Sequence, residues 1–260
     1  MEEKIQCTFL GTSAADFSLL RVTDCKDRFD KNARRASCLQ IGENYLIDCG
    51  VHVLDSLCIA KTDVTKITDI FVTHFHKDHF VAEHAEAIAA DKKTPLRLWC
   101  RRDTCIRDLN NIEVIRMEEG VYYHIANGMN VKAVYANHDE SSFPQHYVFD
   151  FNGKKMMYAT DGAWILTRAF QYLKNAKLDV LIIDATCGDY PGDCRMAEHN
   201  SIPMIRSMIP FMKNAGMIHD KTEIYLTHLA PSLHKPHDET QKLVESDGLT
   251  VAYDGMKLYI

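Results

Sequence analysis

The segment Thr73-His74-Phe75-His76-Lys77-Asp78-His79 is the most informative stretch of this 260-residue chain. It places four residues that can bind metal ions within six positions, between an apolar run that predicts a strand and an Ala-rich run that predicts a helix. An extended backbone would direct His74 and His76 to one side, and a turn would bring Asp78 and His79 to face a second point. This spacing suits two adjacent metal ions better than one ion.

On both sides of this segment the apolar pattern predicts two β-rich halves with interleaved helices. Asn152-Gly153 lies between two strand-like runs and predicts a tight hairpin, because both turn positions need positive φ. Asp254-Gly255 predicts another hairpin between the last two runs. The pattern favours two sheets packed face to face with helices outside. No linker or repeat divides the sequence, so we expect one domain over residues 1–260.

The composition excludes several classes of protein. Thirty Lys+Arg against 36 Asp+Glu give a net charge of −6, and a mildly acidic chain is a poor general binder of nucleic acid. No apolar run approaches the ~20 residues that span a bilayer, so we expect no membrane partner. The acidic start, Met1-Glu2-Glu3-Lys4, shows no signal peptide. Nine cysteines without a Cys-x-x-Cys pair indicate a reduced, cytoplasmic protein.

The His-x-His-x-Asp-His run resembles the signature of the metallo-β-lactamase superfamily, and the chain resembles that superfamily over nearly its whole length. The resemblance implies an α+β fold, a four-layer αββα sandwich. It also implies three later ligands, each at the end of a predicted strand and in the expected order: His138, Asp161 and His228.

The resemblance implies a centre with two divalent metal ions. One ion is assigned to His74, His76 and His138, and the other to Asp78, His79 and His228, with Asp161 bridging. Ligation by His and Asp without Cys suits Zn²⁺, Mn²⁺ or Fe²⁺. Two ions ~3.5–4 Å apart can hold a bridging hydroxide for attack and neutralise phosphate oxygens as charge builds. A phosphodiester substrate therefore suits this centre.

Shorter matches resemble the PhnP-type phosphoribosyl cyclic phosphate phosphodiesterases. Those enzymes carry a Cys-rich structural zinc loop, completed by a His three residues after the last catalytic His. Here the corresponding stretch holds only Cys25, and Pro231 stands at the His position, so we expect that structural zinc to be absent. The matching segments are Arg34-Arg35-Ala36-Ser37-Cys38, His199-Asn200, Leu226-Thr227-His228 and Tyr253-Asp254-Gly255-Met256.

Asp78 and His199 are the candidate catalytic residues, and His199 is also a candidate substrate-binding residue. His199 stands before the predicted helix Pro203–Asn214, with Asn200 as a candidate N-cap. A helix N-terminus is a good place to receive an anion. His199 would protonate the leaving alkoxide or hold the phosphate.

Two arginines and two aspartates are further candidates for the site, because of their chemistry and their positions in the sequence. Arg34 and Arg35 are candidate substrate-binding residues, because guanidinium forks match phosphate oxygens; the alternative is a solvated surface pair. Asp48 and Asp184 end predicted strands and are expected to support ligands rather than bind metal.

The sequence thus predicts a cytoplasmic dinuclear phosphodiesterase for a small cyclic phosphate ester, either a phosphoribosyl cyclic phosphate or a cyclic nucleotide. A tRNA 3′-processing nuclease uses the same centre but usually adds an RNA-gripping arm, and no basic or Gly/Pro-rich insertion is present here. Lactonase or thiolesterase activity remains an alternative function. A homodimer remains a candidate oligomeric state. A di-iron oxidoreductase of this fold typically has Glu where this chain has His76, and a fused flavin domain. A non-catalytic metal-binding relative would usually have lost a ligand.

Overall fold

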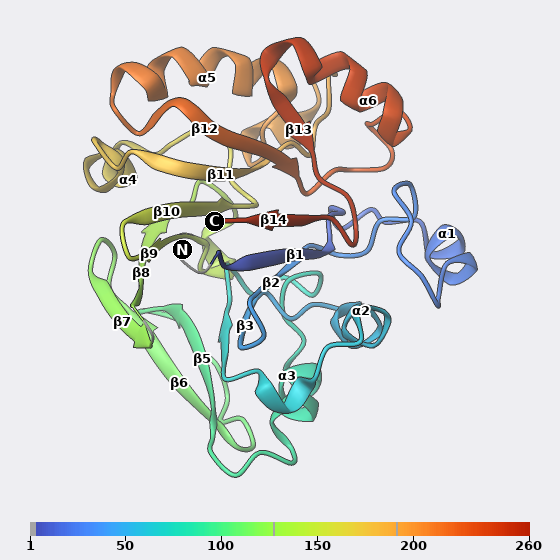
Figure 1. Ribbon diagram of the computed structural model, residues 1–260, viewed down its shortest axis with the longest axis vertical. Coiled ribbons are helices and arrows are strands. Elements are labelled where there is room, and N and C mark those ends of the chain that lie inside the picture. Colours follow the sequence, from blue (N-terminus) through green and yellow to red (C-terminus); the bar gives the residue numbers. More distant parts are fainter. Residues whose placement is uncertain (1–3, 127, 191) are drawn as a thin grey trace.

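A computed structural model describes residues 4–126, 128–190 and 192–260 and arranges them in four layers (Figure 1). Two seven-stranded sheets pack face to face, with helices on their outer faces. The first sheet has the strand order β14-β1-β2-β3-β4-β5-β6, and the second has the order β13-β12-β11-β10-β9-β8-β7. The α+β class and the αββα sandwich expected from the sequence are confirmed.

Each β-rich half of the chain contributes most of one sheet. The first sheet comprises β1 (Gln6–Gly11), β2 (Cys38–Ile41), β3 (Tyr45–Ile47), β4 (Asp69–Phe71), β5 (Leu96–Arg101), β6 (Ile112–Met117) and β14 (Lys257–Tyr259). The second comprises β7 (Tyr122–Ala126), β8 (Met129–Tyr135), β9 (Gln145–Phe151), β10 (Lys154–Ala159), β11 (Leu178–Asp184), β12 (Ile218–Thr227) and β13 (Leu249–Val251).

Helices lie in the connections between strands. The α-helices are α1 (Leu19–Asp24), α2 (Val53–Ala60), α3 (Ala82–Ala89), α4 (Thr167–Leu173), α5 (Ile202–Asn214) and α6 (His237–Val244). Short 3₁₀ helices are η1 (Val64–Lys66), η2 (Glu140–Ser142), η3 (Cys194–Ala197) and η4 (Glu245–Asp247). None of these described helices combines the length and apolar character needed to cross a membrane.

The central core fills the space between the two sheets. Phe71 stacks on Trp99 with ring centroids 5.7 Å apart and meets Phe149 edge-on at 5.1 Å. Separate apolar clusters join the second sheet to α4, α5 and α6, and the first sheet to α2 and α3. Burial on both faces explains why β11 is nearly continuously apolar. Each large side chain buried in this way contributes about 1.5–3 kcal/mol.

The two predicted hairpins have different outcomes. β9 and β10 form the predicted antiparallel hairpin, with φ of 53° at Asn152 and 98° at Gly153. The hairpin predicted at Asp254-Gly255 is wrong, because β13 pairs with β12 in one sheet and β14 pairs with β1 in the other. Gly255 still needs its φ of 86°, but it turns the chain from one sheet to the other.

Parallel pairing determines where functional side chains gather. β3, β4, β5 and β6 are parallel to one another, as are β10, β11, β12 and β13. The loops after β4, β10, β11 and β12 therefore leave the carboxyl ends of parallel strands, where α/β sheets commonly bind ligands. The predicted ligands and His199 belong to these loops and to the loop after β8.

Candidate metal centre

The His-x-His-x-Asp-His segment forms the loop after β4. The strand ends at Phe71, so the strand alternation expected for His74 and His76 does not apply. Instead the segment turns on itself, with the amides of His79 and Phe80 both donating to the His76 carbonyl at 2.9 and 2.8 Å. This turn brings the motif's side chains together with His138, Asp161 and His228, which arrive from the second sheet.

The first ligand group consists of three imidazoles and one carboxylate oxygen. Nδ1 of His76 lies 3.1 Å from Nε2 of His74 and 3.3 Å from Nε2 of His138. Oδ1 of Asp161 lies 4.0 Å from the same His74 nitrogen and 3.8 Å from that of His138. Four potential ligand atoms therefore surround one point.

The second ligand group uses the other oxygen of Asp161. Nε2 of His79 lies 3.2 Å from Nε2 of His228 and 3.3 Å from Oδ2 of Asp78. Oδ2 of Asp161 lies 2.9 Å from His79 Nε2 and 3.0 Å from His228 Nε2. The Asp161 carboxylate thus stands between the two groups, with one oxygen toward each.

These donor sets fit divalent cations. A tetrahedral ion with bonds of ~2.0–2.1 Å holds neighbouring ligand atoms about 3.3 Å apart, close to the spacings within the two groups. Oδ2 of Asp161 is buried and has no hydrogen-bond partner among the described residues. A cation would satisfy that oxygen, and two cations would offset the charges of Asp78 and Asp161.

The outward-facing imidazole nitrogens of the second group are held by neighbouring side chains. Nδ1 of His79 lies 2.7 Å from buried Asp48, which also accepts from the Thr73 amide at 2.8 Å. Nδ1 of His228 lies 2.7 Å from Thr186 Oγ1. Such partners keep the proton on the outer nitrogen and leave the inner one free for a metal. Asp48 thus lies against a candidate ligand, and its supporting role stays a prediction.

Protonation of the two groups differs. Burial lowers the pKa of His74 well below its ordinary value, and the neighbouring imidazoles add to the effect. Burial acts in the same direction on the pKa of His138. At His79 and His228 burial is outweighed by carboxylates, with Asp161 the strongest, and the pKa of His228 rises to about 10. Acidic partners thus favour positive charge in the second group.

Backbone geometry at the centre is unusual. Asp48, Asp161 and His228 have φ of 68°, 51° and 55°, in the left-handed region that side chains other than glycine rarely adopt. Gly50 permits a close approach, because an added Cβ would lie 1.7 Å from the Asp78 carbonyl oxygen. Strained positions of this kind tend to cluster at functional sites.

His199 lies beside the ligands without belonging to either group of four. Its Nδ1 is 2.8 Å from Oδ2 of Asp184, and its ring stacks on that of His228 with centroids 5.4 Å apart. Burial opposes protonation of His199, but Asp184 outweighs burial and raises the pKa. The expected N-cap is wrong: Ser201 caps α5, whereas Asn200 bonds backbone groups of the loop after β10.

A pocket of about 240 Å³ opens above the centre. Arg195, absent from the sequence-based candidates, lines it and forms paired bonds of 2.9 and 3.0 Å with Asp193. The feature of the sequence that could have identified Arg195 is its position between β11 and α5, four residues before His199. The lining residues are Ala14, Ala15, Asp16, His76, Asp78, His138, Asp161, Thr186, Arg195, Glu198, His199 and His228.

The structure does not bring Arg34 and Arg35 to the pocket above the centre, so nothing in it supports the substrate-binding role predicted for them. Their exposed fractions are 7% and 0%, so they are not a solvated pair either. The Arg34 guanidinium donates to Thr12 Oγ1 and to the Ala252 carbonyl, both at 2.6 Å. Arg35 donates to the Cys25 carbonyl at 2.6 Å. Arg34 thus links the N-terminal segment to the chain at Ala252, and Arg35 holds the turn at Cys25 beside Asp254.

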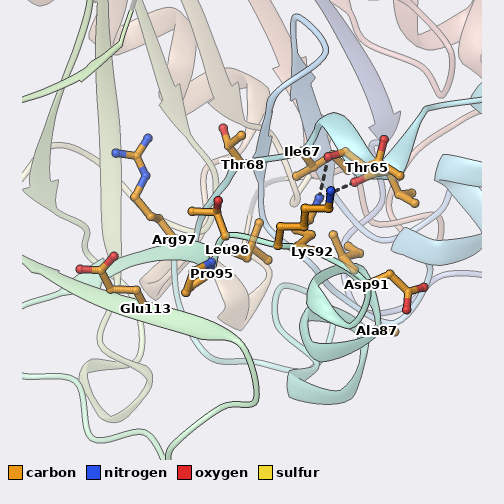
Figure 2. Close-up of a pocket in the computed structure, with 14 residues that line it drawn as sticks. Thr65, Ile67, Thr68, Ala87, Asp91, Lys92, Pro95, Leu96, Arg97 and Glu113 are labelled. Atoms are coloured by element: carbon orange, nitrogen blue, oxygen red, sulfur yellow. Dashed lines mark hydrogen bonds between the residues drawn. The ribbon is translucent and has the colours of Figure 1, made fainter.

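A larger cavity, of about 690 Å³, lies between η1, α3 and the start of β5. Figure 2 shows Lys92 there, turned toward Thr65, and its ammonium donates to the Val64 and Thr65 carbonyls at 2.7 and 3.1 Å. This cavity is at the amino ends of β4 and β5, whereas the ligands follow the carboxyl ends of their strands. The chemistry therefore belongs to the smaller pocket.

The family model described as the beta-lactamase superfamily domain matches residues 43–228. The chain belongs to this superfamily. The matched range contains all seven residues of the two ligand groups. Ribonuclease Z of Methanococcus maripaludis is 26% identical over 182 residues, which are 68% of this chain and 52% of that protein. The chain therefore spans about half the length of that curated relative.

Solved structures of other proteins share the architecture. YhfI from Bacillus subtilis, a metallo-β-lactamase fold protein, superposes with a TM-score of 0.76 at 14% identity, covering 99% of this chain and 100% of its own. A diphosphatase of the PhnP family superposes with a TM-score of 0.74 at 18% identity, covering 99% and 98%. At these identities the likeness concerns the fold.

Proposed function

We propose that this superfamily member is a metal-dependent phosphodiesterase that hydrolyses a small cyclic phosphate ester, such as a phosphoribosyl cyclic phosphate or a cyclic nucleotide. The observation that carries the proposal is the convergence of two ligand groups on Asp161 at the base of the pocket. Two divalent cations bound there would activate a water molecule and neutralise phosphate charge. Zn²⁺, Mn²⁺ and Fe²⁺ all suit the donors.

His199 is the proposed proton donor. Its Nδ1 is engaged with Asp184, so Nε2 is the nitrogen available to substrate. Water oxygen forms a bond to phosphorus, the bond between phosphorus and the ester oxygen breaks, and His199 gives its proton to that oxygen. The products are a phosphate monoester and a free hydroxyl group. Asp78 also lines the pocket, and in this proposal its carboxylate would orient the attacking water.

Arg195 takes the substrate-binding role that the sequence suggested for Arg34 and Arg35. It is the lining residue whose guanidinium can face a phosphate oxygen, and Asp193 holds it in position. Asp16 and Glu198 line the same pocket and would repel additional phosphates. A volume of about 240 Å³ lies below the roughly 300–1,000 Å³ of common ligand pockets. Size and charge both support a small substrate with few phosphates.

Cleavage of RNA is the second candidate, because ribonuclease Z is the curated relative that aligns with 68% of this chain. An RNA substrate would need cationic contacts outside the pocket. The acidic lining residues Asp16 and Glu198 favour the small substrate over this candidate.

The test pairs metal analysis with activity on one purified sample. We expect about two metals per chain and hydrolysis of a five-membered cyclic phosphate and of bis-p-nitrophenyl phosphate. Asp161→Ala should abolish both activities. Turnover of a lactone or thioester without diesterase activity would overturn the substrate class, and cleavage of a tRNA precursor alone would favour the ribonuclease.

The choice of leaving group tests His199 separately. Asp184→Asn and His199→Ala should slow cleavage of the cyclic phosphate by about 10²–10⁴-fold, the usual contribution of a general acid. They should slow bis-p-nitrophenyl phosphate much less, because p-nitrophenolate leaves without a proton. Equal losses on both substrates would contradict the role of His199 as proton donor.

A further inference from the structure

His138 differs from the other four ligand imidazoles. Its Nε2 faces the first group, 3.3 Å from His76 Nδ1. Its other nitrogen, Nδ1, is buried and has no hydrogen-bond partner in the described part of the chain. The outer nitrogens of the other four rings lie 2.7 to 3.3 Å from side-chain oxygens: His79 from Asp48, His228 from Thr186, His74 from Thr73 and His76 from Asp139.

The carboxylate of Glu198 faces this unpaired nitrogen, with Oε2 3.7 Å from His138 Nδ1. The backbone of Glu198 is fixed at the end of η3, because its amide donates to the Arg195 carbonyl at 2.9 Å. Its side chain lines the pocket and is 51% exposed. The oxygen is thus just beyond hydrogen-bond range of His138 Nδ1, on a side chain that its surroundings leave room to move.

The geometry points to Glu198 as a positioning residue that accepts the Nδ1 proton of His138 when Nε2 binds a cation. A ring that gives its Nε2 lone pair to a metal must keep its proton on Nδ1, and a buried donor without an acceptor is costly. An acceptor at that proton also orients the ring and raises its basicity. The inference rests on the proposed metal centre and is independent of the proposed substrate.

Glu198 also connects the metal centre to the pocket's proton donor. It immediately precedes His199, whose ring lies 5.0 Å from that of His138. One short segment, residues 198–199, would thus support a metal ligand with its first side chain and deliver a proton with its second.

Three variants distinguish the effect of the hydrogen bond between Glu198 and His138 from the effect of the Glu198 charge and from changes in the structure of the loop. Glu198→Ala removes the acceptor, whereas Glu198→Gln keeps a carbonyl oxygen and removes only the charge. Asp193→Asn is the matched control: Asp193 caps η3 by accepting from the Arg195 amide at 2.9 Å, and its carboxylate bonds Arg195.

The measurement is a Zn²⁺ titration of metal-free protein against a chromophoric chelator. We expect Glu198→Ala to weaken one of the two binding steps by about tenfold, the lower end of losses on removing such partners. Glu198→Gln should retain most of the affinity, and Asp193→Asn should match wild type. Thermal unfolding of each metal-free variant checks that it is folded.

A second readout is the set of exchange-protected imidazole N–H resonances in the proton NMR spectrum of the zinc form. Glu198→Ala should lose one of these signals. Wild-type affinity and an unchanged spectrum in Glu198→Ala would overturn the role of Glu198, as would an equal loss in Asp193→Asn. Failure of wild type to bind zinc would instead overturn the proposed centre, and the role of Glu198 with it.

Discussion

The two ligand groups share Asp161 but differ in almost every other respect. In the Asp78 group, His79 and His228 are buried, and their outer nitrogens are held by Asp48 and Thr186, which are buried as well. This group brings its own carboxylate in addition to the shared one. It is a preorganised group with two carboxylates.

The His74 group is neutral apart from its share of Asp161, and it is open to the pocket. The side chain of His76 is 40% exposed, and its partner Asp139 is 39% exposed. The outer nitrogen of His138 has no partner in the described residues. The Asp78 group is thus the more enclosed of the two, and the His74 group is the more exposed.

Replacing Asp161 should have the largest effect, because it belongs to both groups. Asp161→Ala leaves each group with three ligands and removes the charge between the cations. We expect loss of both metals on dialysis and a fall in diesterase activity of at least about 10³-fold. Elemental analysis and kinetics on one sample check this; two retained metals with normal activity would contradict the bridging role.

Replacing Asp48 should affect the Asp78 group selectively. Asp48→Asn weakens the acceptor for His79 Nδ1, so affinity at that group should fall about 10–100-fold. A competition titration with Zn²⁺ should show one weakened step and one normal step. Asp63→Asn, a surface substitution at the start of η1, is the control and should leave both steps unchanged. Equal weakening of both steps would remove the distinction between the groups.

Wild-type protein should lose its metals in order. Charge and burial both favour the Asp78 group, so stepwise chelation should remove the metal of the His74 group first, at a concentration of chelator at least about tenfold lower. Metal content measured along the titration should show a plateau near one ion per chain. A single concerted loss would mean that the groups act as one unit.

Replacing Asp139 should have the smallest effect. Asp139 lies 3.3 Å from His76 Nε2, but both side chains are well exposed, and exposed pairs contribute about 0.2–1 kcal/mol. Asp139→Asn should therefore weaken the first group by no more than about fivefold in the same titration. If Asp139→Asn lowered zinc affinity as much as Asp48→Asn, solvent exposure would not reduce what a hydrogen-bond partner of a ligand contributes to metal binding at this centre.

The residues that could be predicted from sequence are those marked by a local pattern. The four ligands of the motif lie within six positions, and the other three end strands whose apolar runs were visible. The structure brings these seven together, and their ligand roles stay predictions. Asp48 and Asp184 were visible in the same way, as the last polar residues of buried strands.

The errors concern contacts between distant parts of the chain. Arg34 and Arg35 looked like phosphate ligands because no local pattern shows that they pack against Thr12, Ala252 and Asp254. The Asp254-Gly255 turn has hairpin chemistry, but the pairing of its flanking strands is decided by β1 and β12. Arg195 lies in the short helix η3 and Glu198 follows it directly. No apolar periodicity marks this connection, so the sequence gives the position of these residues but not the direction of their side chains.

The left-handed backbone at Asp48, Asp161 and His228 has a consequence for how the protein evolves and accumulates. Each such residue costs roughly 1–2 kcal/mol relative to a right-handed conformation. Glycine at any of the three would relax the backbone, but it would remove a candidate ligand at Asp161 or His228, or the partner of His79 at Asp48. Selection for stability alone would therefore weaken metal binding. Cations that bind only the folded chain oppose this, adding about 2.7 kcal/mol at a hundred times their Kd. Metal supply would then set how much folded protein a cell holds, as well as how fast each molecule works.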